Sequence, residues 1–130
     1  MNTPQLERDT CRVVLADDMD DLRFLLELSL ERAGGYEIVG HATNGLEAID
    51  VAKETQPDVL VLDLAMPVMD GMEAIPRIRE VAPATKIVML TGFDSGDLSA
   101  KAMTLGAAAY LEKSLALIDI SSTLQEVCAG

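Results

Sequence analysis

The chain has 130 residues, of which 49% are apolar, and its formal net charge is −12, from 22 acidic and 10 basic residues. This length suits one domain that buries roughly two-thirds of its unfolded surface. No apolar run approaches the length of a membrane span, and the acidic balance disfavours direct nucleic-acid binding, because it repels phosphate backbones.

The first ten residues, MNTPQLERDT, are polar. They lack the apolar stretch of a signal peptide, so we expect residues 1–10 to form a flexible tail and residues 11–130 to form the folded domain. Cys11 and Cys128 lie near opposite ends of the sequence, and the chain has a single histidine. A zinc site is therefore not expected, and both cysteines are predicted to be reduced thiols in a cytosolic protein.

Strand and helix patterns alternate from the start of the domain. Cys11–Ala16 predicts a strand, and Met19–Ala33 predicts a helix, which the two following glycines end. The apolar residues of that helix fall on one face: Leu22, Leu25, Leu26, Leu30 and Ala33. Apolar and polar residues alternate weakly over Tyr36–Ala42, which predicts a second strand. Asn44 is then expected to cap a helix over 45–55.

The second half of the chain continues the same alternation. The predicted strands are Asp58–Leu62, Lys86–Leu90 and Ala107–Glu112, and the predicted helices are about 70–81, Ser95–Leu105 and Ala116–Cys128. The apolar face of the last helix is predicted to hold Leu117, Ile120, Leu124 and Val127. Because the connections are short and the strands are near-continuous apolar runs, the sequence predicts a (βα)5 α/β domain with a doubly wound, five-stranded parallel sheet.

Polar residues follow four of these strands. Asp17 and Asp18 follow the first strand, Asp63 the third, Thr91 the fourth and Lys113 the fifth. The carboxyl ends of parallel strands meet at one edge of a sheet and form its ligand crevice. Three carboxylates, one hydroxyl and one ammonium group are therefore predicted to converge there.

This set of groups suits a divalent cation and a phosphoryl group. Carboxylates about 4 Å apart repel each other by roughly 4 kcal/mol at an effective dielectric near 20, so the cluster either holds protons or binds a cation such as Mg²⁺. Asp63 can act as a nucleophile that forms an acyl phosphate, with Lys113 as the phosphate's partner. Taken singly, each residue has an ordinary interpretation as part of a solvated helix turn, a turn residue or a surface cation.

The run 63–71 (DLAMPVMDG) resembles the receiver domain of bacterial response regulators, with Asp17 and Asp18 upstream and Thr91 and 110–113 (YLEK) downstream. The resemblance extends from Arg12 to about Val127. It implies a flavodoxin-like receiver fold and a role in two-component signal transduction. The stretch 83–114 most resembles receivers that carry a C-terminal helix-turn-helix output domain, and the sequence leaves open whether this is a stand-alone or an excised receiver.

The resemblance also implies a site. Asp63 accepts a phosphoryl group from a sensor histidine kinase or a phosphotransfer protein. Mg²⁺ is held directly by Asp18 and Asp63, through water by Asp17, and by the backbone carbonyl of Ala65. Lys113 pairs with the phosphoryl group.

The resemblance also implies a conformational switch. Thr91 moves towards the phosphoryl group and lets Tyr110 turn inwards, which remodels the face made by the fourth helix, fifth strand and fifth helix. A homodimer through that face is a further expectation. The domain is expected to be cytoplasmic and to have no enzymatic activity beyond its own phosphorylation and dephosphorylation.

Three other functions fit parts of the pattern. Haloacid-dehalogenase-like phosphatases need a second aspartate two residues after the nucleophile, where this chain has Ala65. A flavodoxin-type cofactor binder cradles a phosphate in its first loop, and the four aspartates of 17–21 would repel that phosphate. A scaffold that has lost phosphorylation is the third, and the intact set of polar strand-end residues argues against it.

Overall fold

The computed structural model describes residues 10–92 and 96–129. The elements within these ranges are β1 (Cys11–Ala16), α2 (Asp20–Ala33), β2 (Tyr36–Ala42), α3 (Gly45–Thr55), β3 (Val59–Asp63), α4 (Gly71–Val81), β4 (Lys86–Thr91), α5 (Gly96–Leu105), β5 (Ala109–Glu112) and α6 (Lys113–Ala129). The strands form one parallel sheet in the order β2-β1-β3-β4-β5, which confirms the predicted (βα)5 fold. Residues 1–9 of the tail predicted over 1–10, and the predicted helix start at Ser95, lie outside the described residues.

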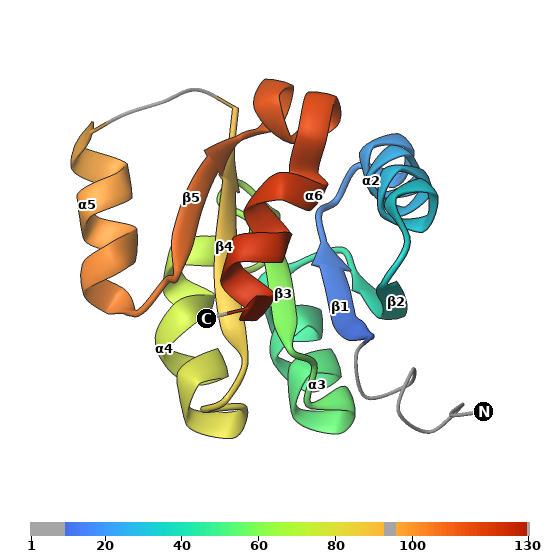
Figure 1. Ribbon diagram of the computed structural model, residues 1–130. Coiled ribbons are helices and arrows are strands. Elements are labelled where there is room, and N and C mark those ends of the chain that lie inside the picture. The colour runs from blue at the N-terminus through green and yellow to red at the C-terminus, as the bar shows by residue number, and fades with distance from the viewer. Residues whose placement is uncertain (1–9, 93–95, 130) are drawn as a thin grey trace.

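Two apolar cores lie on opposite faces of the sheet. Helices α3, α4 and α5 cover one face, and α2 and α6 cover the other (Figure 1). Because successive strand residues point to opposite faces, β3 supplies Leu60 and Leu62 to the first core and Val59 and Val61 to the second. None of these four side chains is more than 1% exposed. The central strands are thus held from both sides, and their carboxyl ends are fixed at one edge of the sheet.

Polar residues just before α3 and α4 fix where these helices begin. Asn44 Oδ1 accepts a hydrogen bond from the backbone N–H of Glu47 at 2.9 Å, and Glu47 Oε1 accepts one from the backbone N–H of Thr43 at 2.8 Å. Asp70 Oδ1 accepts one from the backbone N–H of Glu73 at 2.8 Å. These caps satisfy backbone donors that the first helical turn leaves without partners, and the predicted cap at Asn44 is confirmed.

The burial of α2 differs from the prediction at two positions. Leu22, Leu26 and Leu30 are buried, whereas Leu25 is 48% exposed and Ala33 is exposed. Residues four apart lie one above the other on a helix, so the three buried leucines form one narrow stripe. The helix packs through that stripe, and the predicted face was too wide.

The last strand and helix begin at other residues than predicted. β5 begins at Ala109 rather than at Ala107, and α6 begins at Lys113 rather than at Ala116. Asp119 has the non-helical angles φ −160° and ψ 76°, so the helix changes direction there. The residues after the break, Ile120 and Leu124, are buried as predicted, but Leu117 before it is 44% exposed. The prediction of one continuous apolar helix face across 116–128 was therefore wrong.

In the part of the chain that the structure describes, no helix is both long and apolar enough to cross a bilayer.

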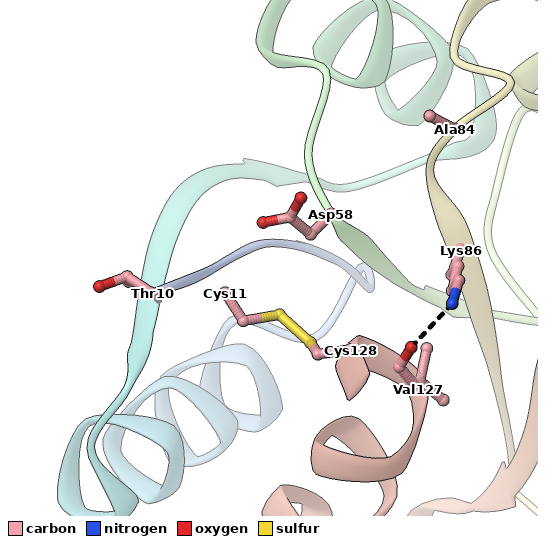
Figure 2. A pocket seen from close by; sticks show the side chains of 7 residues that line it. All are labelled: Thr10, Cys11, Asp58, Ala84, Lys86, Val127 and Cys128. Atoms are coloured by element: carbon pink, nitrogen blue, oxygen red, sulfur yellow. Dashed lines mark hydrogen bonds between the residues drawn. A yellow bond between two sulfur atoms is a disulfide. The ribbon is translucent and has the colours of Figure 1, made fainter. Parts of the chain in front are cut away.

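The prediction of two reduced thiols is also corrected. Cys11, the first residue of β1, and Cys128, near the end of α6, form a disulfide with their Cα atoms 6.5 Å apart (Figure 2). The second half of α6 runs back along the sheet to the amino end of β1, so the fold brings together residues that are 117 positions apart. The spacing of the two cysteines along the chain did not indicate this proximity.

Candidate functional site

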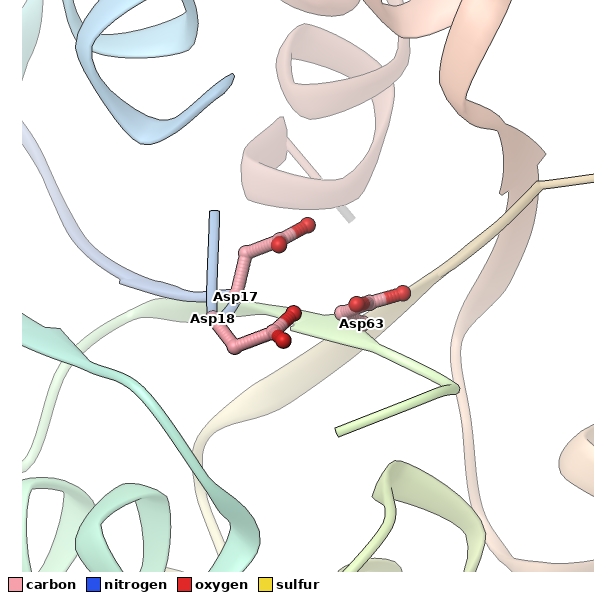
Figure 3. Close-up of side chains that lie close together, drawn as sticks. All are labelled: Asp17, Asp18 and Asp63. Carbon is pink, nitrogen blue, oxygen red and sulfur yellow. The ribbon is translucent and has the colours of Figure 1, made fainter. Parts of the chain in front are cut away.

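The carboxylates predicted to converge lie at the ends of two neighbouring strands. β1 and β3 pair in parallel, with Ala16 opposite Leu62, so Asp17 directly after β1 lies beside Asp63 at the end of β3. Asp18 follows Asp17, and one oxygen from each of the three carboxylates lies within 4.8 Å of the others (Figure 3). The predicted convergence of the three aspartates is confirmed.

Burial divides these carboxylates into two kinds. Asp17 and Asp63 are each 1% exposed, whereas Asp18 is exposed. Asp17 Oδ1 accepts a hydrogen bond from the backbone N–H of Met19 at 2.9 Å. Asp63 Oδ1 accepts a longer one, 3.4 Å, from the backbone N–H of Ala65. The site therefore has a buried pair of carboxylates and a third one that opens to solvent.

Lys113 supplies the positive charge of the site. Its Nζ lies 3.1 Å from Oδ2 of Asp17 and 3.1 Å from Oδ2 of Asp63. Burial lowers the pKa of Lys113, but hydrogen bonds and charge attraction from the two carboxylates outweigh burial and raise the pKa above its usual value. The residue is therefore an ammonium group at neutral pH, and it bridges the two buried carboxylates.

Asp63 has an unusually basic carboxylate. Burial and the negative charge of Asp17 raise its pKa from 3.8 to about 6, although Lys113 and the Ala65 N–H act in the opposite direction. Neutralising one carboxylate would relieve that repulsion, and so would a cation placed among the three. The donor set consists of hard oxygen atoms with one carboxylate open to water, which fits Mg²⁺.

The loop between β3 and α4 holds Asp63 in place through close backbone packing. The backbone N–H of Gly71 donates to Leu64 O at 2.8 Å, and a Cβ at Gly71 would lie 2.3 Å from the carbonyl oxygen of Asp63. Any larger residue would push α4 away from the strand end. Sequence reasoning quoted Gly71 within the motif without assigning it this task, although a glycine directly after a helix cap is a signal for close approach.

The same loop contains a strained residue that sequence reasoning missed. Val68 has φ +68°, a backbone conformation that β-branched residues rarely adopt, and its side chain is 76% exposed. The next residue, Met69, accepts a hydrogen bond through its carbonyl oxygen from the N–H of Gly45 at 2.8 Å. The loop is thus tied to the start of α3, and Val68 forms its exposed turn.

Thr91 and Tyr110 lie on the neighbouring strands β4 and β5, two register positions apart. Thr91 is the last residue of β4 and is 1% exposed. Tyr110 of β5 pairs in register with Met89, two residues before Thr91, so both side chains project from the same face. Tyr110 is half-buried, and its hydroxyl oxygen has no hydrogen-bond partner among residues 10–92 and 96–129.

Comparisons with known protein families, sequences and structures all identify the same kind of domain. The model of the response regulator receiver domain family matches residues 13–125. Chemotaxis protein CheY of Thermotoga maritima is 35% identical over 78% of this chain and 84% of its own length. Transcriptional regulatory protein LnrK of Bacillus subtilis is 34% identical over 92% of this chain. Among solved structures, the signal receiver domain of the response regulator NarL from Mycobacterium tuberculosis has a TM-score of 0.88 and 29% identity, with 94% of this chain and 98% of that chain covered.

Several curated relatives are longer than this chain. The match covers 54% of LnrK, 57% of a transcriptional regulator of Pseudomonas aeruginosa and 32% of a protein-glutamate methylesterase of Paramagnetospirillum magneticum. The shared part is the domain that contains the three aspartates, so the likeness concerns this domain rather than the activities of the longer proteins.

Proposed function

The chain belongs to the response regulator receiver domain family and is a signal receiver of the two-component type; on that premise, we propose that it receives its signal as a phosphoryl group on Asp63. The observation that carries this proposal is the ammonium group of Lys113, 3.1 Å from both buried carboxylates, with Asp18 beside them. The site thus combines a nucleophile, Asp63, with an ammonium group that can neutralise developing negative charge and a third carboxylate that can bind a metal.

The proposed step is phosphoryl transfer from a phosphohistidine of a sensor kinase or phosphotransfer protein. A carboxylate oxygen of Asp63 attacks the phosphorus atom, the bond from phosphorus to the imidazole nitrogen breaks, and the neutral imidazole leaves with the bonding electron pair after proton uptake. Lys113 then exchanges part of its contact with Asp63 for a phosphoryl oxygen. The carboxyl group must be ionised to attack, and in the metal-free site burial and Asp17 oppose this by raising the pKa of Asp63 to about 6.

Mg²⁺ is the cofactor that the donor set fits. Asp17, Asp18, Asp63 and the backbone carbonyl of Ala65 would hold it, Asp17 mainly through water. When bound, the ion supplies positive charge that keeps Asp63 ionised and neutralises phosphoryl oxygens. The chain's own residues then orient the nucleophile, since α4 packs directly against the carbonyl of Asp63.

The proposed output is a change at the face formed by α5, β5 and α6. Thr91 and Tyr110 project from the same face of the sheet, and the Tyr110 hydroxyl has no partner in the described residues that would hold it in place. Movement of Thr91 towards the phosphoryl group would let Tyr110 turn inwards and reshape this face, which we propose as a partner or homodimer surface. The domain would act in the cytoplasm, without binding nucleic acid directly and without enzymatic turnover of an external substrate.

Intact-mass spectrometry tests the proposal. The purified chain is incubated with acetyl phosphate, a small phosphoryl donor, with and without Mg²⁺. We expect the mass of one phosphoryl group to be gained only with Mg²⁺, and not in Asp63→Asn. A gain that persists in Asp63→Asn would place the acceptor elsewhere. No gain from acetyl phosphate or from a histidine kinase would favour a scaffold that has lost phosphorylation.

A further inference from the structure

We propose that Cys11 and Cys128 are a redox-active pair, which opens and closes by exchange with small-molecule thiols and disulfides such as glutathione. The two sulfur atoms are bonded in the structure and join the start of β1 to the end of α6. The pair lies at the amino end of β1, away from the carboxyl ends of the strands that carry Asp63. The inference therefore does not depend on phosphoryl acceptance.

Access to the disulfide is the first argument. Cys128 is exposed, whereas Cys11 is only 8% exposed. Two surface hollows meet at the bond, and both cysteines line each of them; one hollow also contains Lys86, and the other contains Tyr36. Figure 2 shows the first hollow with the disulfide at its wall. A small thiol can therefore reach the Cys128 sulfur, which a buried structural disulfide would not allow.

Charged groups in the first hollow provide the second argument. Lys86 and Asp58 both line it with the cysteines, and Asp58 Oδ2 is already engaged by the backbone N–H of Arg12 at 2.9 Å. A cation beside a cysteine favours the thiolate, which is the reactive form in exchange. Lys86 brings a positive charge to this hollow, where its Nζ is hydrogen-bonded to the carbonyl oxygen of Val127, and Asp58 brings a negative charge.

Contacts that do not involve sulfur hold the end of α6 against the sheet. Lys86 Nζ donates a hydrogen bond to the carbonyl oxygen of Val127 at 3.1 Å, and the Tyr36 hydroxyl donates one to the carbonyl oxygen of Ser121 at 3.1 Å. Leu124, between them in sequence, is fully buried. These contacts do not require the disulfide, so we expect the two thiols to stay close after reduction and to close again without refolding of the domain.

The chemistry of opening balances with two equivalents of thiol. A glutathione thiolate attacks Sγ of Cys128, the bond between the two protein sulfurs breaks, and Cys11 leaves as a thiolate that takes up a proton. A second glutathione thiolate attacks the glutathione sulfur of the mixed disulfide and releases Cys128 as a thiol. The protein disulfide is reduced and oxidised glutathione is formed, and closing is the reverse sequence.

Closing this bond should stabilise the domain strongly. It joins residues 117 positions apart, so it restricts the unfolded chain over nearly its whole length. We expect the melting temperature of the reduced protein to be on the order of 10 °C lower than that of the oxidised protein. An oxidising environment would therefore make the receiver more resistant to unfolding.

The test measures the number of free thiols in the protein as the ratio of reduced to oxidised glutathione is varied. The native chain is equilibrated with mixtures of reduced and oxidised glutathione, quenched with acid and labelled with a maleimide, and the intact mass gives the number of free thiols. We expect two thiols in the most reducing mixtures, none in the most oxidising ones, and the same midpoint from either direction. A disulfide that survives every reducing mixture, thiols that survive every oxidising one, or a lasting glutathione adduct would each overturn the proposal.

Cys128→Ser is the matched control, because residue 128 is exposed and its replacement spares the core. Its melting temperature should be the same in reducing and oxidising buffer, whereas that of the native chain should change. An unchanged melting temperature in the native chain despite a change in thiol number would refute the stabilising role. Phosphoryl acceptance is read separately by mass, so failure of one proposal leaves the other measurable.

Discussion

Asp63 should destabilise the metal-free domain at neutral pH, and Asp63→Asn should relieve that cost. The unfolded aspartate ionises above pH 3.8, whereas the folded one ionises only above about pH 6, because burial and Asp17 disfavour its charge. Between these values the folded state holds more protons, so the stability of the native chain falls as the pH rises. The full difference corresponds to about 3 kcal/mol above pH 7.

The amide that replaces the carboxyl group in Asp63→Asn would not titrate, but it would lose the ion pair with Lys113. We therefore expect the variant to be about 1–3 kcal/mol more stable than the native chain above pH 7, with a gain that shrinks towards pH 4. Urea unfolding followed by far-ultraviolet circular dichroism is the suitable assay, because the chain has no tryptophan, and a chelator keeps the site free of metal. The exposed carboxylate of Asp50 provides the control, since Asp50→Asn should change stability little at any pH. A variant less stable than the native chain at pH 8, or a gain that does not vary with pH, would refute the reasoning.

Three further predictions concern the same edge of the sheet. Gly71→Ala should lower the free energy of unfolding by about 1–3 kcal/mol and reduce labelling by acetyl phosphate, because the new methyl group would lie 2.3 Å from the Asp63 carbonyl oxygen. Gly96→Ala is the control, because a methyl group there would meet open space, and equal stability of the two variants would contradict the packing argument. Val68→Asn should raise stability by about 1 kcal/mol in urea unfolding, because asparagine tolerates φ +68° better, whereas Val68→Thr should give no gain. Lys113→Ala should raise the pKa of Asp63 above about 6, since the ammonium group now lowers it, and a carboxyl carbon NMR titration that gives an unchanged or lower pKa would contradict this role.

The order of elements and the convergence of the site could be predicted because both depend on local sequence. Continuous apolar runs such as 59–62 mark strands buried on both faces, and a parallel sheet brings its strand ends to one edge. That rule places Lys113 at the same edge as Asp17 and Asp63, whereas its contact with both carboxylates depends on the tertiary structure. The roles of Thr91 and Tyr110 remain predictions.

Features that depend on tertiary contacts could not be predicted. The disulfide between Cys11 and Cys128 requires the path of α6 back to the start of β1. The exposure of Leu117 depends on the break at Asp119, which helical periodicity does not reveal. The strain at Val68 arises because the loop must turn between the end of β3 and the start of α4, whatever residue stands there.

The most direct test of the central claim is to trap the modified residue chemically. After incubation with acetyl phosphate and Mg²⁺, excess donor is removed and the chain is treated with hydroxylamine, which displaces phosphate from an acyl phosphate and leaves a hydroxamate on the same carbonyl carbon. Fragment-ion sequencing of the peptides then locates the modified residue. The account predicts one hydroxamate, on Asp63, that depends on Mg²⁺ and is accompanied by release of inorganic phosphate. A hydroxamate on Asp17 or Asp18 instead, or a phosphoryl group that resists hydroxylamine, would contradict it.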